Sequence, residues 1–413
     1  MKNAIKKKEA EGNLSAEERA KNFLLNPRLL DEVLDDLALL GLVGESTNKQ
    51  IVYLCASSRK LHDPIGLVLH SSSSSGKTVL ANTIAKLIPP EEVFEFSKIR
   101  YQALNYIGRD NPDILKNKVI LVTELQGVMA KEVSYVLRQL LTEHKHCYLT
   151  TKKGLPEWIH LNGPVSFIST TTKEFDEEVG NRILGITLDE SKEQTSAIQT
   201  SQKRLFAGNG LNGNTEILLQ KHHLAQKMLN PCSVVIPFAE HIRFPANKLR
   251  ARRDHMKFLN LISAVAFLYQ YQREKTGENG MVVKASVADY KLAYELYKPL
   301  FEELNVHVNP IQHKLMLEIQ NFVSGNARKR KIHPDAVTFT RGDVVNASSW
   351  TLRQVRTHVD ELVDNEFLTI LQGSKGRTYK YRLNNCFLNA DTVKELATPE
   401  ELEHEISSNE GIK

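Results

Sequence analysis

The sequence predicts an α/β fold with a central parallel sheet, followed by a smaller helical domain that ends in a β-hairpin. Three apolar runs of strand length, at residues 66–70, 118–124 and 165–172, are separated by segments with helical character. Runs that are apolar on both faces are typical of strands in a parallel sheet, because helices cover both of its sides. From about residue 306 the pattern changes to short helices and two final strands, which predicts a second domain.

The first apolar run leads into a loop of small residues and then into a helical segment. We assign nucleotide binding to the following loop residues: Ser72, Ser73, Ser74, Ser75, Gly76, Lys77, Thr78 and Val79. Successive backbone N–H groups at a helix N-terminus bind anions, Lys77 neutralises phosphate charge, and the Thr78 hydroxyl is suited to ligate Mg²⁺. Ser71 stands where the usual P-loop motif has its first glycine. The flanking strand and helix favour a P-loop over a serine-rich surface loop, so we expect ATP and Mg²⁺ as ligands.

The second apolar run ends in Thr123 and Glu124. The carboxyl ends of parallel strands are where α/β proteins bind their ligands. ATPases usually carry two acids at this position, and here the first is replaced by threonine. We therefore assign the orientation of the attacking water to Glu124, and Mg²⁺ binding to Thr78, waters and the Thr123 hydroxyl. An ordinary surface glutamate after a buried strand is the alternative interpretation.

The third run ends in hydroxyl residues at 170–172, and we take Thr171 as a γ-phosphate sensor, although spacing alone does not choose among the three. Arg182 follows ten residues later and is a candidate arginine finger that contacts the γ-phosphate of a neighbouring subunit. The basic start of a later amphipathic helix, at 250–253, predicts a helical lid that contributes one arginine to the phosphates. We assign Arg253 to this role, and the other arginines of that segment stay open as alternatives.

Residues 147–151 and 158–162 have the pattern of two short strands joined by a turn that contains Lys152 and Lys153. A hairpin directly before the third core strand is where ring-shaped DNA translocases place a pore loop. Lysines at its tip would hold phosphates without reading sequence. A solvated hairpin whose lysines serve solubility is the alternative.

Three helices followed by a hairpin with a basic tip predict a winged helix-turn-helix in residues 306–386. In this motif the second helix enters the DNA major groove and the wing lies on the phosphate backbone. The expected DNA contacts are Arg353 and Arg356 on the helix and Lys375 and Arg377 in the turn. Winged helices also dock proteins, which is the alternative use of such a domain.

The whole chain divides into five predicted parts. They are an N-terminal helical segment (1–60), the P-loop core (61–190), a helical lid region (191–305), the winged helix-turn-helix (306–386) and an acidic tail (387–413). A length of 413 residues suits two or three domains, and 25% charged residues is ordinary for a globular protein. The net charge of +5 permits nucleic-acid binding without requiring it.

Composition and cysteine spacing also predict the cellular location of the protein. No apolar run approaches the length of a membrane span, and the lysine-rich start lacks the apolar core of a signal peptide, so we expect no membrane partner. The four cysteines are far apart, which argues against a zinc site and a disulfide framework. Both observations favour a reducing, cytoplasmic location.

With these motifs in place, the chain resembles the ATPase region of the DNA primase-like proteins that bacterial mobile elements carry. The stretches that carry the resemblance are Gly41–Glu45, Asn48–Lys49, Ser58–Arg59, Ser71–Thr78, Gln102–Tyr106, Tyr135–Arg138, Thr170–Thr172, Glu178–Arg182, Leu188–Glu190 and Arg252–His255. The order of core, hairpin, Asn-Arg pair and winged helix is also similar to that of minichromosome-maintenance-type helicases. The resemblance implies an AAA+-like P-loop NTPase that forms a ring and moves on DNA or opens it.

Two departures from that family limit the prediction. No zinc-finger cysteines and no Toprim acidic cluster precede the ATPase motifs, so we do not expect this chain to synthesise primers. A separate primase or another replication or effector protein is the expected partner. Thr123 replaces the first acid of the usual pair, which puts the rate of hydrolysis in question.

The leading hypothesis is an ATP-hydrolysing DNA translocase or helicase of a mobile element or phage, acting as a homo-hexamer. Single-stranded DNA would occupy the pore, and double-stranded DNA the winged helix. The alternative is a DNA-bound ATP switch that loads or recruits a transposase, replicase or defence effector without unwinding. A small-molecule kinase is a weaker third idea, because it leaves the winged helix unexplained.

Overall fold

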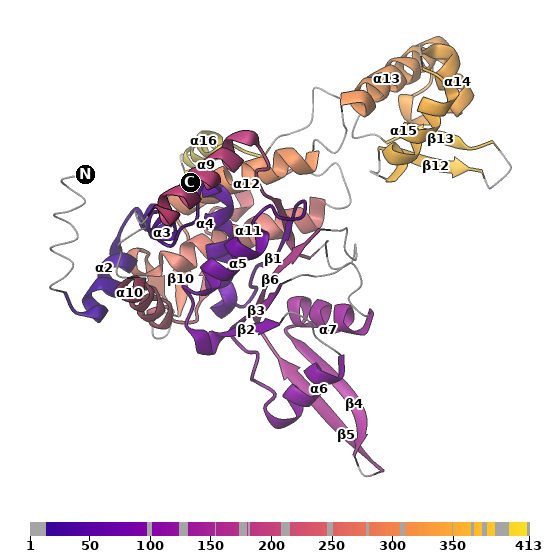
Figure 1. Cartoon of the computed structure of the whole chain (residues 1–413). Coiled ribbons are helices and arrows are strands. Elements are labelled where there is room, and N and C mark those ends of the chain that lie inside the picture. The colour runs from indigo at the N-terminus through magenta and orange to yellow at the C-terminus, as the bar shows by residue number, and fades with distance from the viewer. Residues whose placement is uncertain are drawn as a thin grey trace. The chain divides into compact units, whose positions relative to one another are not determined.

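The computed structural model describes most of the chain, and its elements are labelled in Figure 1. The described ranges are 14–96, 101–123, 131–152, 154–172, 180, 182–207, 215–245, 251–277, 281–305, 310–348, 350–364, 367–373, 378–384 and 396–410. The chain divides into two compact units. One unit comprises Met1–Glu240 with Met256–Leu296, and the other comprises His241–His255 with Tyr297–Lys413.

A five-stranded sheet with every neighbouring pair parallel forms the centre of the first unit, in the order β2-β3-β6-β1-β7. The strands are β1 (Gly66–His70), β2 (Val93–Phe96), β3 (Lys118–Val122), β6 (Val165–Thr171) and β7 (Leu184–Thr187). All of β6 and nearly all of β1 and β3 are buried, as their continuous apolar sequence requires. This sheet confirms the predicted α/β class. Because β6 lies between β1 and β3, the carboxyl ends of these three strands lie side by side.

The first unit also contains a series of helices along the chain. They are α2 (Ala16–Leu25), α3 (Leu29–Leu39), α4 (Ser46–Ser57), α5 (Lys77–Ala85), α6 (Tyr101–Asp110), α7 (Lys131–Thr142), α9 (Lys192–Phe206) and α10 (Thr215–Met228), together with the short 3₁₀ helices η1 (Ser58–Lys60) and η2 (Pro90–Glu92). The first of them begins with a capping box, in which Ser15 and Glu18 satisfy each other's backbone N–H groups. Helices α11 (Ala251–Leu268) and α12 (Val287–Asn305) follow, with a small sheet of β8 (Ser233–Val235), β9 (Lys275–Thr276) and β10 (Val282–Lys284).

An antiparallel hairpin of β4 (Lys145–Lys152) and β5 (Leu155–Asn162) precedes β6. Its strands are longer and its turn shorter than the sequence pattern predicts, because Lys152 already pairs with Leu155. Figure 1 shows the hairpin extending away from the parallel sheet, with α6 beside it. Gly108 permits this approach, since a Cβ there would lie 2.6 Å from the His160 carbonyl oxygen on β5.

A buried polar network joins the N-terminal helices to α10. The Arg59 guanidinium is fully buried, forms an ion pair with Glu92 and donates 2.7 Å to Gln226 Oε1. The Gln226 amide in turn donates 3.0 Å to the Tyr53 hydroxyl. Tyr53 also contacts His222, which is fully buried and hydrogen-bonded to Asp36 Oδ2 at 2.9 Å.

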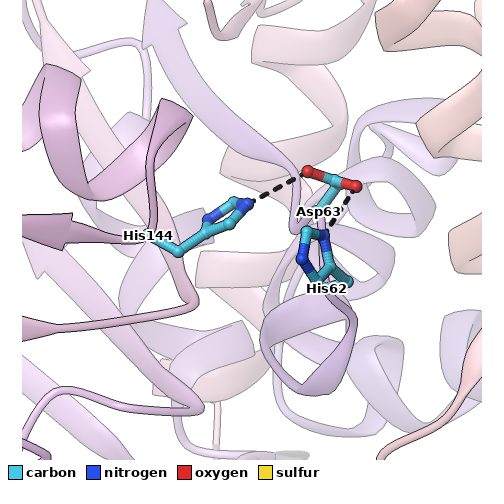
Figure 2. Close-up of side chains that lie close together, drawn as sticks. All are labelled: His62, Asp63 and His144. Carbon is cyan, nitrogen blue, oxygen red and sulfur yellow. Dashed lines mark hydrogen bonds and ion pairs between the residues drawn. The ribbon is translucent and has the colours of Figure 1, made fainter.

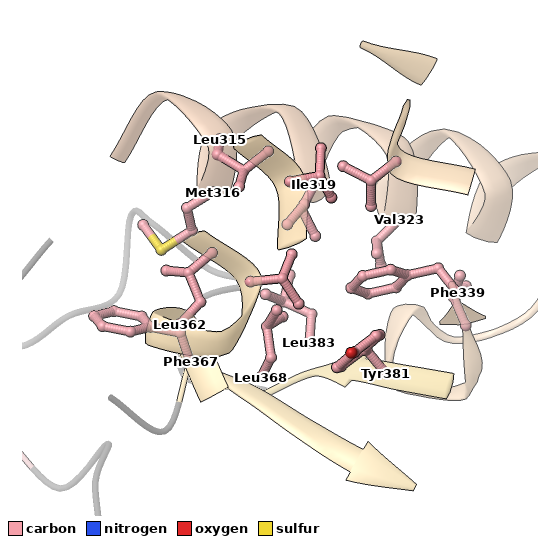
Figure 3. Close-up of a cluster of buried hydrophobic side chains, with 14 of the residues drawn as sticks. Leu315, Met316, Ile319, Val323, Phe339, Leu362, Phe367, Leu368, Tyr381 and Leu383 are labelled. Atoms are coloured by element: carbon pink, nitrogen blue, oxygen red, sulfur yellow. The ribbon is translucent and has the colours of Figure 1, made fainter. Parts of the chain in front are cut away.

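Within the second unit, helices α13, α14 and α15 pack with a three-stranded antiparallel sheet in the order β11-β13-β12. These elements are α13 (Pro310–Arg330), α14 (Arg341–Ala347), α15 (Leu352–Asp364), β11 (Thr338–Phe339), β12 (Leu368–Gln372) and β13 (Lys380–Leu383). Apolar residues from α13, α15 and the strands meet in one core, where Ile319 and Val323 lie near Phe339 (Figure 3). Thr340 begins α14 with a capping box to Asp343.

The described part of the acidic tail forms helix α16 (Pro399–Glu410), in which Glu401 and Glu405 form ion pairs with Arg243. Across the described residues, none of the helices combines the length and the apolar character that crossing a membrane requires.

Candidate nucleotide site

The P-loop connects the end of β1 to the first residue of α5. Ser74 and Gly76 both have left-handed backbones, with φ of 68° and 94°. A Cβ at Gly76 would meet no atom within 4 Å, so the backbone conformation alone, and not crowding, favours glycine there. The loop ends on the N-terminus of α5, where unsatisfied N–H groups favour an anion.

Lys77 extends back over the loop. Its side chain is buried, and Nζ donates to the Ser71 carbonyl at 2.9 Å and to the Ser75 hydroxyl at 3.2 Å. It also donates to the Ser72 carbonyl at 2.5 Å. Burial lowers the pKa of Lys77, and the Glu190 carboxylate opposes that change. The ammonium group is therefore held at the concave side of the loop by three oxygen acceptors.

Glu190 binds the start of the P-loop. Its Oε1 accepts the Ser71 hydroxyl and the Ser72 backbone N–H, each at 2.7 Å. The Ser71 and Ser72 hydrogen bonds lower the pKa of Glu190 to about 2, so the carboxylate is charged at neutral pH. Sequence reasoning gave Glu190 no role. The available signal was its position shortly after β7, a strand that pairs with β1.

Three further contacts fix the segment that carries Glu190. The Asp189 N–H donates 2.7 Å to Glu45 Oε1, and the Asn48 amide donates 2.8 Å to the Thr187 carbonyl. The amide of Gln194, in the first turn of α9, donates 2.9 Å to the Val43 carbonyl. The residues after β7 are thus tied both to the P-loop and to the turn before α4.

The carboxyl ends of the neighbouring strands β6 and β3 lie beside the P-loop. Thr171 is buried and pairs with His70, and its carbonyl accepts the Ser71 N–H at 3.4 Å. Thr123 is half-buried just after β3, with its N–H donating 3.2 Å to the Phe96 carbonyl. Thr78 and Val79 are exposed in the first turn of α5. The structure thus brings Thr171 and Thr123 to the same sheet edge as the P-loop, while Glu124 lies outside the described residues.

Arg182 lies at the amino-terminal ends of the parallel strands, opposite the carboxyl ends where the P-loop lies. It lies two residues before β7, which runs parallel to β1, whereas the P-loop follows β1. The side chain is half-buried, and its Nε donates 2.9 Å to the Thr142 hydroxyl of the same chain. Arg182 is therefore not brought together with the P-loop of its own chain.

The remaining predicted site residues lie elsewhere. Arg253 is exposed on the first turn of α11, in the second unit. Lys152 ends β4, and Lys153 is outside the described residues. Arg353 and Arg356 are both exposed on α15. Lys375 and Arg377 are outside the described residues as well.

Comparison with known proteins supports the interpretation of this loop. The family model described as MTBMA_p00010 P-loop domain matches residues 13–223, just over half of the chain. The matched range contains the parallel sheet, the P-loop, the hairpin and helices α2 to α9. No curated protein matches the chain.

Proposed function

Because the chain belongs to the MTBMA_p00010 P-loop domain family, we propose that it binds ATP with Mg²⁺ and uses ATP hydrolysis to move along DNA or to open it. The observation that carries this proposal is the construction of one sheet. A P-loop lies at the carboxyl edge of β1, and a long hairpin is inserted directly before the adjacent strand β6. Such a sheet can couple nucleotide state to an element that contacts a polymer.

The nucleotide chemistry follows from the residues at the carboxyl edge. Lys77 and the N–H groups of the P-loop bind the β- and γ-phosphates, and Thr171 contacts the γ-phosphate. The exposed Thr78 hydroxyl, with Thr123 nearby on the edge, supplies the oxygen ligands that Mg²⁺ prefers. When bound, Mg²⁺ neutralises the charge on the phosphates. Glu124 orients the water that attacks the γ-phosphorus and accepts its proton as the bond to the β-phosphate oxygen breaks.

The position of Arg182 supports a ring of identical subunits. Its place at the amino edge of the sheet separates it from the phosphates of its own chain. A γ-phosphate contact by Arg182 therefore requires a second subunit, which supplies a finger in trans. This geometry favours an AAA+-like homo-hexamer with nucleotide between subunits, in which Arg253 belongs to a helical lid.

DNA binding is assigned to two basic elements. Lys152 and Lys153 at the hairpin tip would hold the backbone of single-stranded DNA, and Trp158 on β5 is 62% exposed and available for base stacking. In the second unit, the three helices and small sheet of residues 310–383 support a winged helix, with Arg353 and Arg356 on the exposed face of α15. Lys375 and Arg377 belong to the segment between β12 and β13, which would be the wing.

A DNA-bound ATP switch is the second candidate. The observation that favours it is Thr123, because a hydroxyl in place of an acid weakens Mg²⁺ binding and slows hydrolysis. In this version the winged helix locates the protein on DNA, and nucleotide state governs the recruitment of a transposase, replicase or defence effector. In both versions the proposed host is a mobile element or phage, the proposed location is cytoplasmic, and the proposed protein partner is a separate primase or another replication or effector protein.

Strand displacement separates the two candidates. The full-length protein is mixed with a forked duplex carrying a labelled strand, with and without ATP, beside a Lys152→Ala/Lys153→Ala double variant. Lys145→Ala, at the other end of β4, is the matched control. A motor releases the strand only with ATP, and the tip variant loses release while the control keeps it. DNA binding and ATP hydrolysis without any release would support the switch instead.

A further inference from the structure

Two histidines and an aspartate form a cluster outside the nucleotide site (Figure 2). His62 Nδ1 lies 3.0 Å from Asp63 Oδ2, and His144 Nε2 lies 3.1 Å from Asp63 Oδ1. Each residue offers one potential ligand atom, and these three atoms lie within 4.8 Å of one another. From these positions we propose that His62, Asp63 and His144 form a binding site for a divalent transition-metal ion of the zinc class.

The local backbone holds these ligands in place. His62 and Asp63 occupy a turn after η1, where the Leu61 N–H donates 2.8 Å to the Ser58 carbonyl and the Ile65 N–H donates 2.9 Å to the Ser58 hydroxyl. His144 has a left-handed backbone with φ of 55°, and its carbonyl accepts the Gly163 N–H at 2.6 Å. Both turns are therefore fixed before any ion binds, which reduces the entropy cost of assembling the site.

The charge and chemistry of the cluster match the proposed ion. The Asp63 carboxylate lies between the two imidazoles, with one oxygen near each ring. Two imidazole nitrogens with one carboxylate favour zinc and its neighbours, whereas Mg²⁺ prefers oxygen ligands alone. The site needs no cysteine, so the scattered cysteines do not bear on it.

Exposure leaves room for further ligands. The His62 and Asp63 side chains are 78% and 57% exposed, and that of His144 is 16% exposed. Ligand atoms around zinc lie roughly 3–3.5 Å apart, since the bonds are about 2.1 Å long. The exposed His62 side chain can rotate to close this distance, and water can fill the solvent side. One His144 nitrogen, Nδ1, is buried without a hydrogen-bond partner, which leaves Nε2 as the nitrogen that faces the cluster.

The site is distinct from the nucleotide site. His62 and Asp63 precede β1, whereas the P-loop follows it, and a five-residue strand is roughly 16 Å long. His144 directly precedes β4. A bound ion would therefore join the turn before β1 to the base of the β4–β5 hairpin. Its role is structural, because it fixes the base of the hairpin to the sheet, and this holds whatever the hairpin binds.

Cobalt titration tests the proposal without any activity assay. Co²⁺ is added to full-length protein free of nucleotide, visible absorption is recorded, and Zn²⁺ is then added as competitor. The variants are His62→Gln, Asp63→Asn and His144→Gln, with His160→Gln, an exposed histidine on the neighbouring hairpin, as the matched control. We expect one Co²⁺ per chain, displaced by Zn²⁺, and an affinity at least about tenfold lower in each cluster variant but unchanged in the control.

Two outcomes would overturn the proposal. One is the absence of a saturable Co²⁺ spectrum, and the other is equal Co²⁺ affinity in the wild-type protein and the Asp63→Asn variant. His62 is so exposed that His62→Gln is expected to fold normally, so this variant decides the question even if His144→Gln is unstable. Lys77→Ala should bind Co²⁺ like wild type, which separates this result from any failure of nucleotide binding.

Discussion

The Glu190 carboxylate accepts a hydrogen bond of 2.7 Å from the Ser72 backbone N–H. An N–H of a P-loop that would otherwise face a phosphate is thereby satisfied by an acid from the same chain. The contact also places a negative charge near the Lys77 ammonium, whose pKa it raises against the effect of burial. Glu190 therefore both shapes the loop and opposes the approach of a polyanion.

Glu190→Gln is expected to strengthen ATP binding by roughly fivefold, the effect of removing one unit charge near another in water-like surroundings. The glutamine carbonyl retains an acceptor for the Ser72 N–H, so the loop keeps its shape. Titration with a fluorescent ATP analogue measures the affinity. Asp189→Asn is the matched control because Asp189 is the adjacent exposed acid. Weaker binding by Glu190→Gln would mean that the charge itself organises the loop.

Subunit mixing tests the shared site. Lys77→Ala and Arg182→Ala should each be inactive alone, because the first lacks phosphate binding and the second lacks the finger. If Arg182 acts in trans, a mixed ring contains interfaces where an intact P-loop meets an intact Arg182. We therefore expect the mixture to regain a fraction of the wild-type ATPase rate. No recovery in rings shown to contain both subunits would contradict a role in trans.

Arg59 should be important for stability because its guanidinium is fully buried in a polar network. Arg59→Met leaves Glu92 and Gln226 without their buried partner, and loss of one member of a buried ion pair typically costs about 3–5 kcal/mol. Urea unfolding followed by circular dichroism measures this loss. Arg28→Ala removes an exposed ion pair with Asp31 and should leave the unfolding midpoint unchanged. Equal midpoints for Arg59→Met and wild type would refute the buried role.

Acid should destabilise the first unit through His222. Burial lowers the pKa of this imidazole further than the Asp36 carboxylate raises it, so the folded state holds the ring neutral. The unfolded chain binds a proton below pH 6.5 or so, and stability is therefore lost as the pH falls through that value toward 5. The slope is at most about 1.4 kcal/mol per pH unit for one proton.

His222→Gln should flatten this slope even though it also lowers stability at pH 7. His223→Gln, in the next and less buried position, should keep the slope of the wild type. Unfolding free energies between pH 7 and pH 5 provide the comparison. A slope unchanged by His222→Gln would assign the acid sensitivity to other groups.

The sequence was most informative where local patterns decide the structure. Continuous apolar runs predict the parallel strands β1, β3 and β6, and the Gly76–Lys77 pair predicts the P-loop, which the family match confirms. Both signals lie within a few neighbouring residues. The roles of Glu124, Arg182 and the DNA-binding residues stay predictions, because each depends on a nucleotide, a DNA strand or a second subunit.

Contacts between distant residues were not predictable in the same way. Glu190 meets Ser72 across 118 positions, and His144 meets Asp63 across 81. Arg59 and Lys60 form a short basic segment, yet Arg59 is fully buried because Glu92 and Gln226 approach it from other elements. Such contacts are set by strand order and by helix packing, which residue spacing does not encode.

The most direct test of the central claim is ATP turnover with and without single-stranded DNA, measured for wild type and Glu124→Gln. If the protein is an ATP-driven DNA motor, ATP turnover should rise at least about tenfold when DNA is added. Glu124→Gln should abolish this turnover, because positioned catalytic groups contribute strongly to the rate. Turnover that is slow and indifferent to DNA would contradict the translocase, and would leave an ATP-binding switch as the function of this P-loop protein.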